Sequence, residues 1–109
     1  MVALNLMQNA FHAMPNGGRL TIVGEDVGGA AIVRFSDTGV GIDAADVRHI
    51  FDPFFSRRAD GVSGTGLGLT ISKSIVSRYD GSISVDSSKG VGSVFTVTLP
   101  SADRGEVGA

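Results

Sequence analysis

The first helix expected along the chain carries one polar stripe on an otherwise apolar surface. Residues 2–14 have helical periodicity, and at about 100° per residue four polar side chains fall within an arc of roughly 100°. These side chains belong to Asn5, Gln8, Asn9 and His12. Apolar residues from Leu4 to Met14 cover the remaining surface, so we expect most of this helix to be buried. Residues 15–18 contain a proline and two glycines, which end the helix.

Four β-rich segments follow a hairpin pattern. The expected strands are residues 19–24, 30–36, 82–87 and 93–99. Residues 26–29 and 89–92 are glycine-bearing and join the strands of each pair. Pro100 ends the last strand.

Two further helices and a loop complete the pattern. Asp43 is expected to cap a short helix over residues 44–50. Apolar residues at four-residue spacing predict a helix over residues 67–79, with Gly81 at its C′ position. Residues 52–66 are polar, glycine-bearing and aperiodic, which indicates a loop. This order predicts an α+β fold, a two-layer α/β sandwich with a mixed, mainly antiparallel sheet and helices on one face.

The composition fits one small globular domain. The chain has 109 residues, of which 42% are apolar and 18% charged, and its net charge of −2 does not suggest a nucleic-acid surface. There is no apolar run near the ~18 residues of a membrane span, no signal peptide and no cysteine, so we expect a cytoplasmic location. We expect residues 1–100 to form the domain and residues 101–109 a flexible tail.

Two polar features are candidates for nucleotide chemistry. The amide oxygen of Asn9 suits a hard cation such as Mg²⁺, with Asn5 one helical turn earlier as support. Asp37 can accept a hydrogen bond from an exocyclic amine such as that of adenine, and Gly39 and Gly41 would let a base approach closely. Each feature has an ordinary alternative, namely solvated asparagines and a plain Asp-Thr-Gly turn.

Three further segments have both a functional and an ordinary interpretation. The glycine cluster at residues 64–68 precedes a helix and suits a phosphate or a flexible hinge, but it matches neither the P-loop nor the dinucleotide fingerprint. The aromatic residues within 51–55 would anchor a lid, dock a partner or pack in the core. Arg57 and Arg58 offer cations to a phosphate, although most surface arginines have no such role.

Taken together, four short motifs resemble the ATP-binding catalytic domain of bacterial sensor histidine kinases, in the GHKL superfamily with its Bergerat-type sandwich. The motifs are the N box at residues 5–10, the G1 box at residues 37–42, the F box at residues 51–55 and the G2 box at residues 64–69. Each motif alone is unspecific, but all four in this order and spacing are very specific. The resemblance covers residues 3–100, and residues 9–15 further resemble the nitrogen-sensor type of kinase.

The resemblance implies that the domain binds ATP and Mg²⁺. Asn9 would bind the metal, Asp37 would recognise the adenine amino group, and Asn5, Asn9 and Arg58 would be the catalytic residues. The implied nucleotide-binding set is Asn9, His12, Asp37, Gly39, Gly41, Ile42, Gly64, Thr65, Gly66, Leu67 and Gly68.

Two departures from the family concern partners. The family's domain normally has an upstream strand and helix, whereas this chain begins at the N box. We therefore expect one sheet edge to be exposed in this chain. Either the chain is truncated, or a partner such as a second copy covers that edge. The chain also has no phosphoacceptor histidine helix. The implied partners are a histidine-bearing dimerisation domain and a downstream response regulator, with no nucleic acid and no direct membrane contact.

The leading hypothesis is transfer of the γ-phosphoryl group of Mg-ATP to a histidine on another domain. GHKL ATPases have a glutamate at the position of Asn5, where it activates water; an asparagine cannot act as that base, which favours transfer to a protein over hydrolysis. One alternative is a serine kinase of the anti-sigma-factor type, which usually has a base at this position and lacks the F box. The other is a non-catalytic nucleotide-binding or docking remnant.

Overall fold

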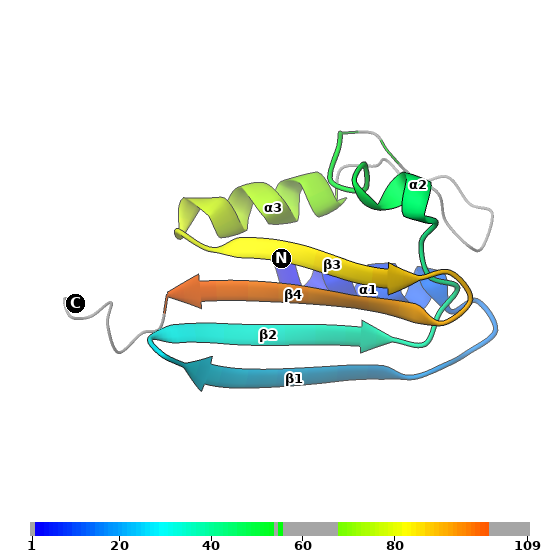
Figure 1. Ribbon diagram of the computed structural model, residues 1–109, viewed down its shortest axis with the longest axis horizontal. Helices are drawn as coiled ribbons and strands as arrows, with labels where there is room; N and C mark the ends of the chain where they lie inside the picture. Colours follow the sequence, from blue (N-terminus) through cyan, green and yellow to red (C-terminus); the bar gives the residue numbers. More distant parts are fainter. Residues whose placement is uncertain (1, 54, 56–67, 101–109) are drawn as a thin grey trace.

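The computed structural model describes residues 2–53, 55 and 68–100 of the chain. Its elements are α1 (Val2–Ala13), β1 (Leu20–Val27), β2 (Ala30–Asp37), α2 (Ala44–Val47), α3 (Gly68–Arg78), β3 (Ser82–Ser88) and β4 (Gly92–Pro100). Figure 1 shows the four strands side by side in one sheet with α1 behind it. The expected tail at residues 101–109 lies outside the described residues.

The sheet has the strand order β1-β2-β4-β3, and each neighbouring pair is antiparallel. The predicted α+β class and the mainly antiparallel sheet are confirmed. Both hairpins also form, but the first loop is shorter than expected, because β1 continues to Val27 and only Gly28 and Gly29 separate it from β2. Pro100 is the last residue of β4, opposite Ala30 at the start of β2.

The core lies between the sheet and the helices. Phe35 of β2 and Phe95 of β4 are direct partners in the register, and Val97 pairs with Ile83 one step along the sheet. Since alternate residues of a strand point to the same face, these side chains all lie on the helix side. The buried cluster consists of Leu6, Phe35, Ile50, Val76, Ile83, Phe95 and Val97.

The first helix differs from the prediction in its burial. Only Leu6 and Ala10 of α1 are buried, whereas Leu4 is 51% exposed and Phe11 is 58% exposed. The expectation that most of this helix is buried is therefore wrong. The periodicity identified the helix, but the surface that a helix covers depends on which elements pack beside it.

Two helix ends also differ from the sequence prediction. The helix over residues 44–50 is limited to α2, and Asp43 makes no side-chain cap bond; its carboxylate instead pairs with Lys89 at 3.1 Å. At the end of α3 the residue with positive φ is Asp80 (61°), and the Gly81 N–H donates to the Val76 carbonyl at 3.0 Å. Asp80 is thus the C′ residue, so this position comes one residue earlier than expected. Gly81 is the residue that follows it.

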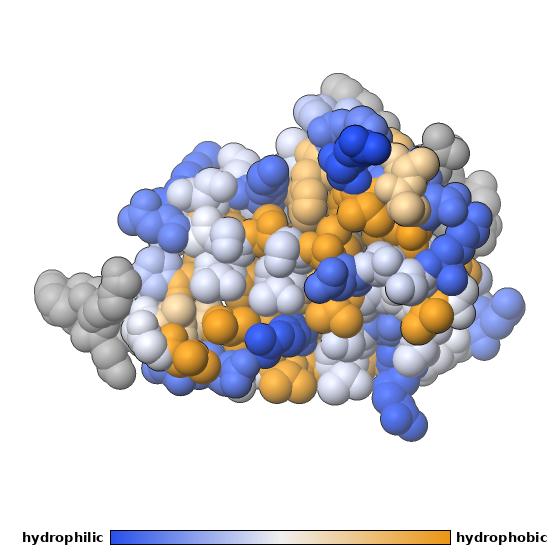
Figure 2. All heavy atoms as spheres, in the orientation of Figure 1, coloured by the Kyte–Doolittle hydropathy of each residue, from blue (hydrophilic) through white to orange (hydrophobic). Residues whose placement is uncertain are grey.

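At one edge of the sheet, no described strand pairs with the outer side of β1. β1 is an outer strand, and its side chains are exposed from Thr21 to Val27, including Ile22, Val23 and Val27 at about half of their surface. Figure 2 shows the face of the sheet that the helices leave uncovered, where apolar patches lie among polar side chains. Among the described residues, no helix is long and apolar enough to cross a membrane.

Candidate functional site

Asp37 ends β2 with a buried carboxylate. Its side chain is on the helix face of the sheet, two residues after Phe35, and the residue is 8% exposed. Gly39 N–H donates to Asp37 Oδ1 at 2.9 Å, and the Ser93 N–H also donates to this carboxylate. Burial raises the pKa of Asp37 above its ordinary value of 3.8, and the two backbone hydrogen bonds act against that rise.

The glycine turn after Asp37 is packed against protein on both sides. A Cβ on Gly39 would lie 2.4 Å from the Ala13 carbonyl oxygen, and Val40 N–H donates to that same oxygen at 2.9 Å. Gly41 has φ 72°, and a Cβ there would lie 2.2 Å from the Ser88 carbonyl oxygen. Positive φ thus occurs at Gly41 and not at Gly39. Both glycines allow main chain from α1 and from the β3–β4 hairpin to approach the turn.

The polar stripe of α1 lies beside the start of α3. Asn5 Nδ2 donates to the Gly68 carbonyl at 3.3 Å and to Ser72 Oγ at 3.2 Å. Asn9 Nδ2 is buried and has no hydrogen-bond partner among the described residues. His12, one turn further on, is half-buried. Asn5 therefore connects two helices, while Asn9 has a polar atom that nothing in the described protein satisfies.

The second glycine cluster is described only at its last residue. Gly68 is the first residue of α3, and two residues later the Thr70 hydroxyl donates to the Phe51 carbonyl at 2.8 Å. The predicted phosphate residues Gly64, Thr65, Gly66 and Leu67, and the predicted lid cation Arg58, lie outside the described residues. The F box residues Phe51 and Phe55 pack against the core cluster.

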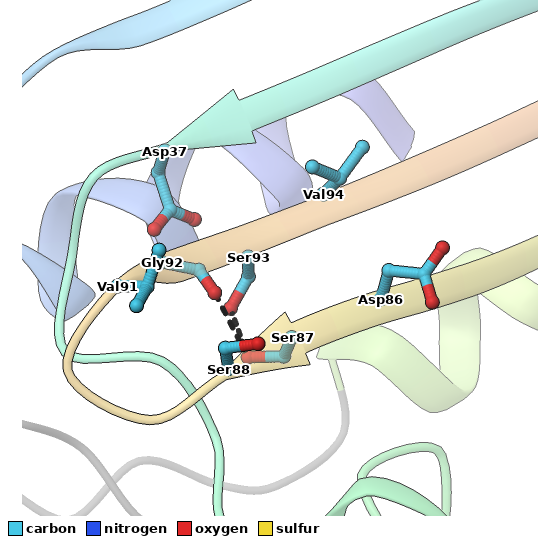
Figure 3. Close-up of a pocket in the computed structure, with 8 residues that line it drawn as sticks. All are labelled: Asp37, Asp86, Ser87, Ser88, Val91, Gly92, Ser93 and Val94. Atoms are coloured by element: carbon cyan, nitrogen blue, oxygen red, sulfur yellow. Dashed lines mark hydrogen bonds between the residues drawn. The ribbon is translucent and has the colours of Figure 1, made fainter.

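A pocket of about 290 Å³ opens beside Asp37 at the end of the β3–β4 hairpin (Figure 3). Its lining residues are Asp37, Asp86, Ser87, Ser88, Val91, Gly92, Ser93 and Val94. Asn5 and Asn9 are not among them. Helix α1 connects the Asp37 turn to α3. Ala13 at the end of α1 contacts the turn after Asp37, and Asn5 contacts α3. Asn9 lies one turn, about 6 Å, from each of these contacts.

Sequence reasoning missed two serines of this pocket. Ser93 is 5% exposed and pairs with Asp37 in the β2–β4 register, and Ser87 pairs with Ser93 in the β3–β4 register. Both continue the alternation of core-facing positions that contains Phe95 and Val85. A polar residue at an expected core position of a strand was the signal that could have identified them.

The profile of the histidine kinase-, DNA gyrase B- and HSP90-like ATPase family matches residues 1–103. The chain belongs to this family. Sensor histidine kinase ZraS of Salmonella typhi is 40% identical over 100 residues, which cover 91% of this chain and 21% of that protein. The chain thus spans about a fifth of the length of this curated relative.

Solved structures agree with this assignment. The mycobacterial sensor histidine kinase MprB superposes with a TM-score of 0.78 at 30% identity, over 91% of this chain and 67% of the other. Full-length ShkA, in complex with AMPPNP, superposes with a TM-score of 0.79 at 26% identity, over 91% of this chain and 20% of the other. The domain therefore has the GHKL fold and is related to the catalytic domains of sensor histidine kinases, as the four motifs predicted. The resemblance to nitrogen sensors stays a prediction.

Proposed function

We propose that the chain binds ATP through Asp37 and, with Mg²⁺, transfers the γ-phosphoryl group to a histidine on a separate dimerisation domain. The observation that carries this proposal is the buried Asp37 carboxylate, oriented by two backbone N–H groups at the wall of a pocket. A carboxylate has about four acceptor positions, so lone pairs remain for the amino group of adenine.

Asn9 is the residue that we propose for Mg²⁺. An asparagine amide can present its oxygen or its nitrogen at one place, so the unsatisfied buried position at Asn9 suits a ligand oxygen of a hard cation. The ion would lower the cost of charge that develops on the transferred phosphoryl group. Since Asn9 lies between the Asp37 turn and the start of α3, a nucleotide held at Asp37 would extend its phosphates along α1.

Asn5 supports transfer to protein rather than hydrolysis. An amide cannot take a proton from water, and the Asn5 amide nitrogen is already engaged with Gly68 and Ser72. We therefore propose that Asn5 acts by holding α3 against α1, in place of the expected support of the metal. Catalysis would come from positioning and charge neutralisation, to which the remaining predicted residues His12, Ile42 and Arg58 and the glycine cluster contribute.

The partners that we propose follow from the relatives, whose names are those of sensor histidine kinases. They are a histidine-bearing dimerisation domain and a response regulator, in the cytoplasm. The open edge β1 favours a second copy of the chain as a further partner, because an outer strand presents unpaired backbone groups. A stable, cooperatively folding monomer in size-exclusion chromatography would contradict this last proposal.

Titration calorimetry with Mg-ATP tests the nucleotide site. We expect saturable binding by the whole chain, weaker by roughly 10–100-fold in Asp37→Asn and Asn9→Ala, because each loses a polar contact in a buried site. Asp86→Asn is the matched control, since Asp86 is an exposed carboxylate at the same pocket and should change affinity less than about twofold.

The same titration and a phosphate-transfer assay together separate the kinase proposal from its two alternatives. No heat at millimolar nucleotide would favour the non-catalytic docking remnant. For a chain that does bind, phosphate transfer from labelled ATP to an added histidine-bearing dimerisation domain supports the kinase proposal. Labelling of a serine instead would support the anti-sigma-type alternative.

A further inference from the structure

Ser87 holds three polar groups with one hydroxyl, near the end of β3. The Ile42 N–H donates to Ser87 Oγ at 2.8 Å. The Gly92 carbonyl oxygen lies 3.1 Å from the same atom, and the Ser93 hydroxyl lies 2.7 Å away (Figure 3). A hydroxyl has one proton and two lone pairs, so these three contacts use its whole hydrogen-bonding capacity.

The protons of this cluster have two arrangements. When Ser87 donates to the Gly92 carbonyl, Ser93 must donate to Ser87, and the Ser93 oxygen keeps only lone pairs for other partners. When Ser87 instead donates to Ser93, the Ser93 proton is free to turn elsewhere. The Ser87 hydroxyl therefore decides whether Ser93 offers an acceptor or a donor.

Ser93 lies beside the carboxylate that we propose for adenine. It is opposite Asp37 in the β2–β4 register, its backbone N–H donates to that carboxylate, and both residues are buried. Ser93 and Asp37 line one pocket together with Ser87. A base that hydrogen-bonds to Asp37 in this pocket has the Ser93 hydroxyl as a neighbouring polar group.

Ser87 also fixes the glycine turn to the β3–β4 hairpin. Ile42 is the residue directly after Gly41, so its bond to Ser87 restrains the end of that turn. The Gly90 N–H donates to the Val40 carbonyl at 2.7 Å on the same side. The turn and the hairpin are thus joined by a main-chain bond and by the Ser87 side chain.

We propose that Ser87 is a positioning residue for base recognition. Its hydroxyl links the main chain of the glycine turn to the Ser93 hydroxyl, and it sets the polarity that Ser93 presents next to Asp37. This inference rests on the proposed binding of adenine at Asp37. Ser87 acts through Ser93 and Ile42, so its removal should alter the preference for one base over another as well as the affinity.

The test compares two nucleotides in the whole chain. Mg-ATP and Mg-ITP are titrated into the wild type, Ser87→Ala, Ser87→Thr and Ser84→Ala; inosine has an oxygen where adenine has its amino group. We expect Ser87→Ala to weaken ATP binding about tenfold and to lower the preference for ATP over ITP about fivefold. Ser87→Thr keeps the hydroxyl, so it should retain most of the affinity for ATP and most of the preference for ATP over ITP. Ser84 is exposed on the other face of β3, so Ser84→Ala should match the wild type.

Each outcome distinguishes this inference from the proposed function. A wild type that binds no ATP would overturn both. A wild type that binds ATP, together with a Ser87→Ala variant that is folded by circular dichroism and weakens ATP and ITP equally, would overturn the inference alone, because a purely structural role lowers both affinities. Failure of Ser87→Thr to restore the ATP preference would overturn it as well.

Discussion

The two sides of α1 differ in how closely the rest of the protein packs against them and in how many hydrogen bonds it makes there. On the side of Asp37 and α3, main-chain and hydroxyl groups pair with one another, and two glycines admit backbone at van der Waals limits. On the other side, Leu4 and Phe11 of α1 are exposed, and at the edge of the sheet so are Ile22, Val23 and Val27 of β1. The tightly constrained region contains the N box and the G1 box. Close packing and hydrogen bonding thus mark the proposed nucleotide site, where Asn9 Nδ2 is the buried polar atom left without a partner among the described residues.

The largest effect should come from a methyl group at the constrained turn. In Gly41→Ala the new Cβ meets the Ser88 carbonyl, and φ of 72° is strained for alanine, so we expect a loss of about 5 kcal/mol in unfolding free energy. Gly90→Ala is the matched control: φ is 84°, but no atom of the described residues lies within 4 Å of the added Cβ, so only about 1–2 kcal/mol should be lost. Urea denaturation measures both, and equal losses would contradict the packing argument.

Phenylalanine truncations should distinguish the two regions next. Phe95 is buried in the core and 5% exposed, so Phe95→Ala should cost about 3–5 kcal/mol. Phe11 is 58% exposed, and Phe11→Ala should cost less than about 1 kcal/mol. A large cost at Phe11 would mean that its face of α1 is covered in solution. Thermal and urea unfolding of both variants provide the comparison.

The smallest effect concerns the pH dependence of stability at Asp37. Because burial raises the pKa of Asp37 in the folded chain, the unfolded chain releases this proton first as pH rises through 3.8. The group therefore contributes stability below that pH, and this contribution is lost as pH rises through the folded pKa. We expect Asp37→Asn to gain stability relative to the wild type at pH 7, and the gain to shrink towards pH 3.8. In urea denaturation, a difference in unfolding free energy between Asp37→Asn and the wild type that stays constant from pH 7 to pH 4 would contradict a raised pKa of Asp37.

The sequence predicted the elements and the carboxylate, but not the serines around it. Asp37 was identifiable because it belongs to one of four motifs whose order and spacing are specific, although an Asp-Thr-Gly turn alone is ordinary. Ser87 and Ser93 were missed because serine is common in strand hairpins, and their significance comes from the cross-strand register that places them beside Asp37. Register is a long-range property, which local patterns specify only weakly.

The exposed side was mispredicted for a related reason. Phe11 has the hydrophobicity of a core residue, but its burial depends on whether another element lies over that face of α1. Asp80 took the C′ position before Gly81 because an aspartate tolerates positive φ and leaves the glycine to the next residue. In both cases the sequence identified the helix, and its tertiary surroundings decided the details.

The central claim is that α1, the Asp37 turn and the start of α3 hold one magnesium-bound adenine nucleotide. It is tested most directly by recording amide resonances of the whole chain while a non-hydrolysable ATP analogue and Mg²⁺ are added. The account predicts that the Asn9 side-chain amide and the backbone amides of Gly39 and Ser93 shift along one binding curve, and that removal of Mg²⁺ reduces the Asn9 shift most. Shifts confined to the Asp37 turn, with Asn9 unchanged at saturation, would contradict it.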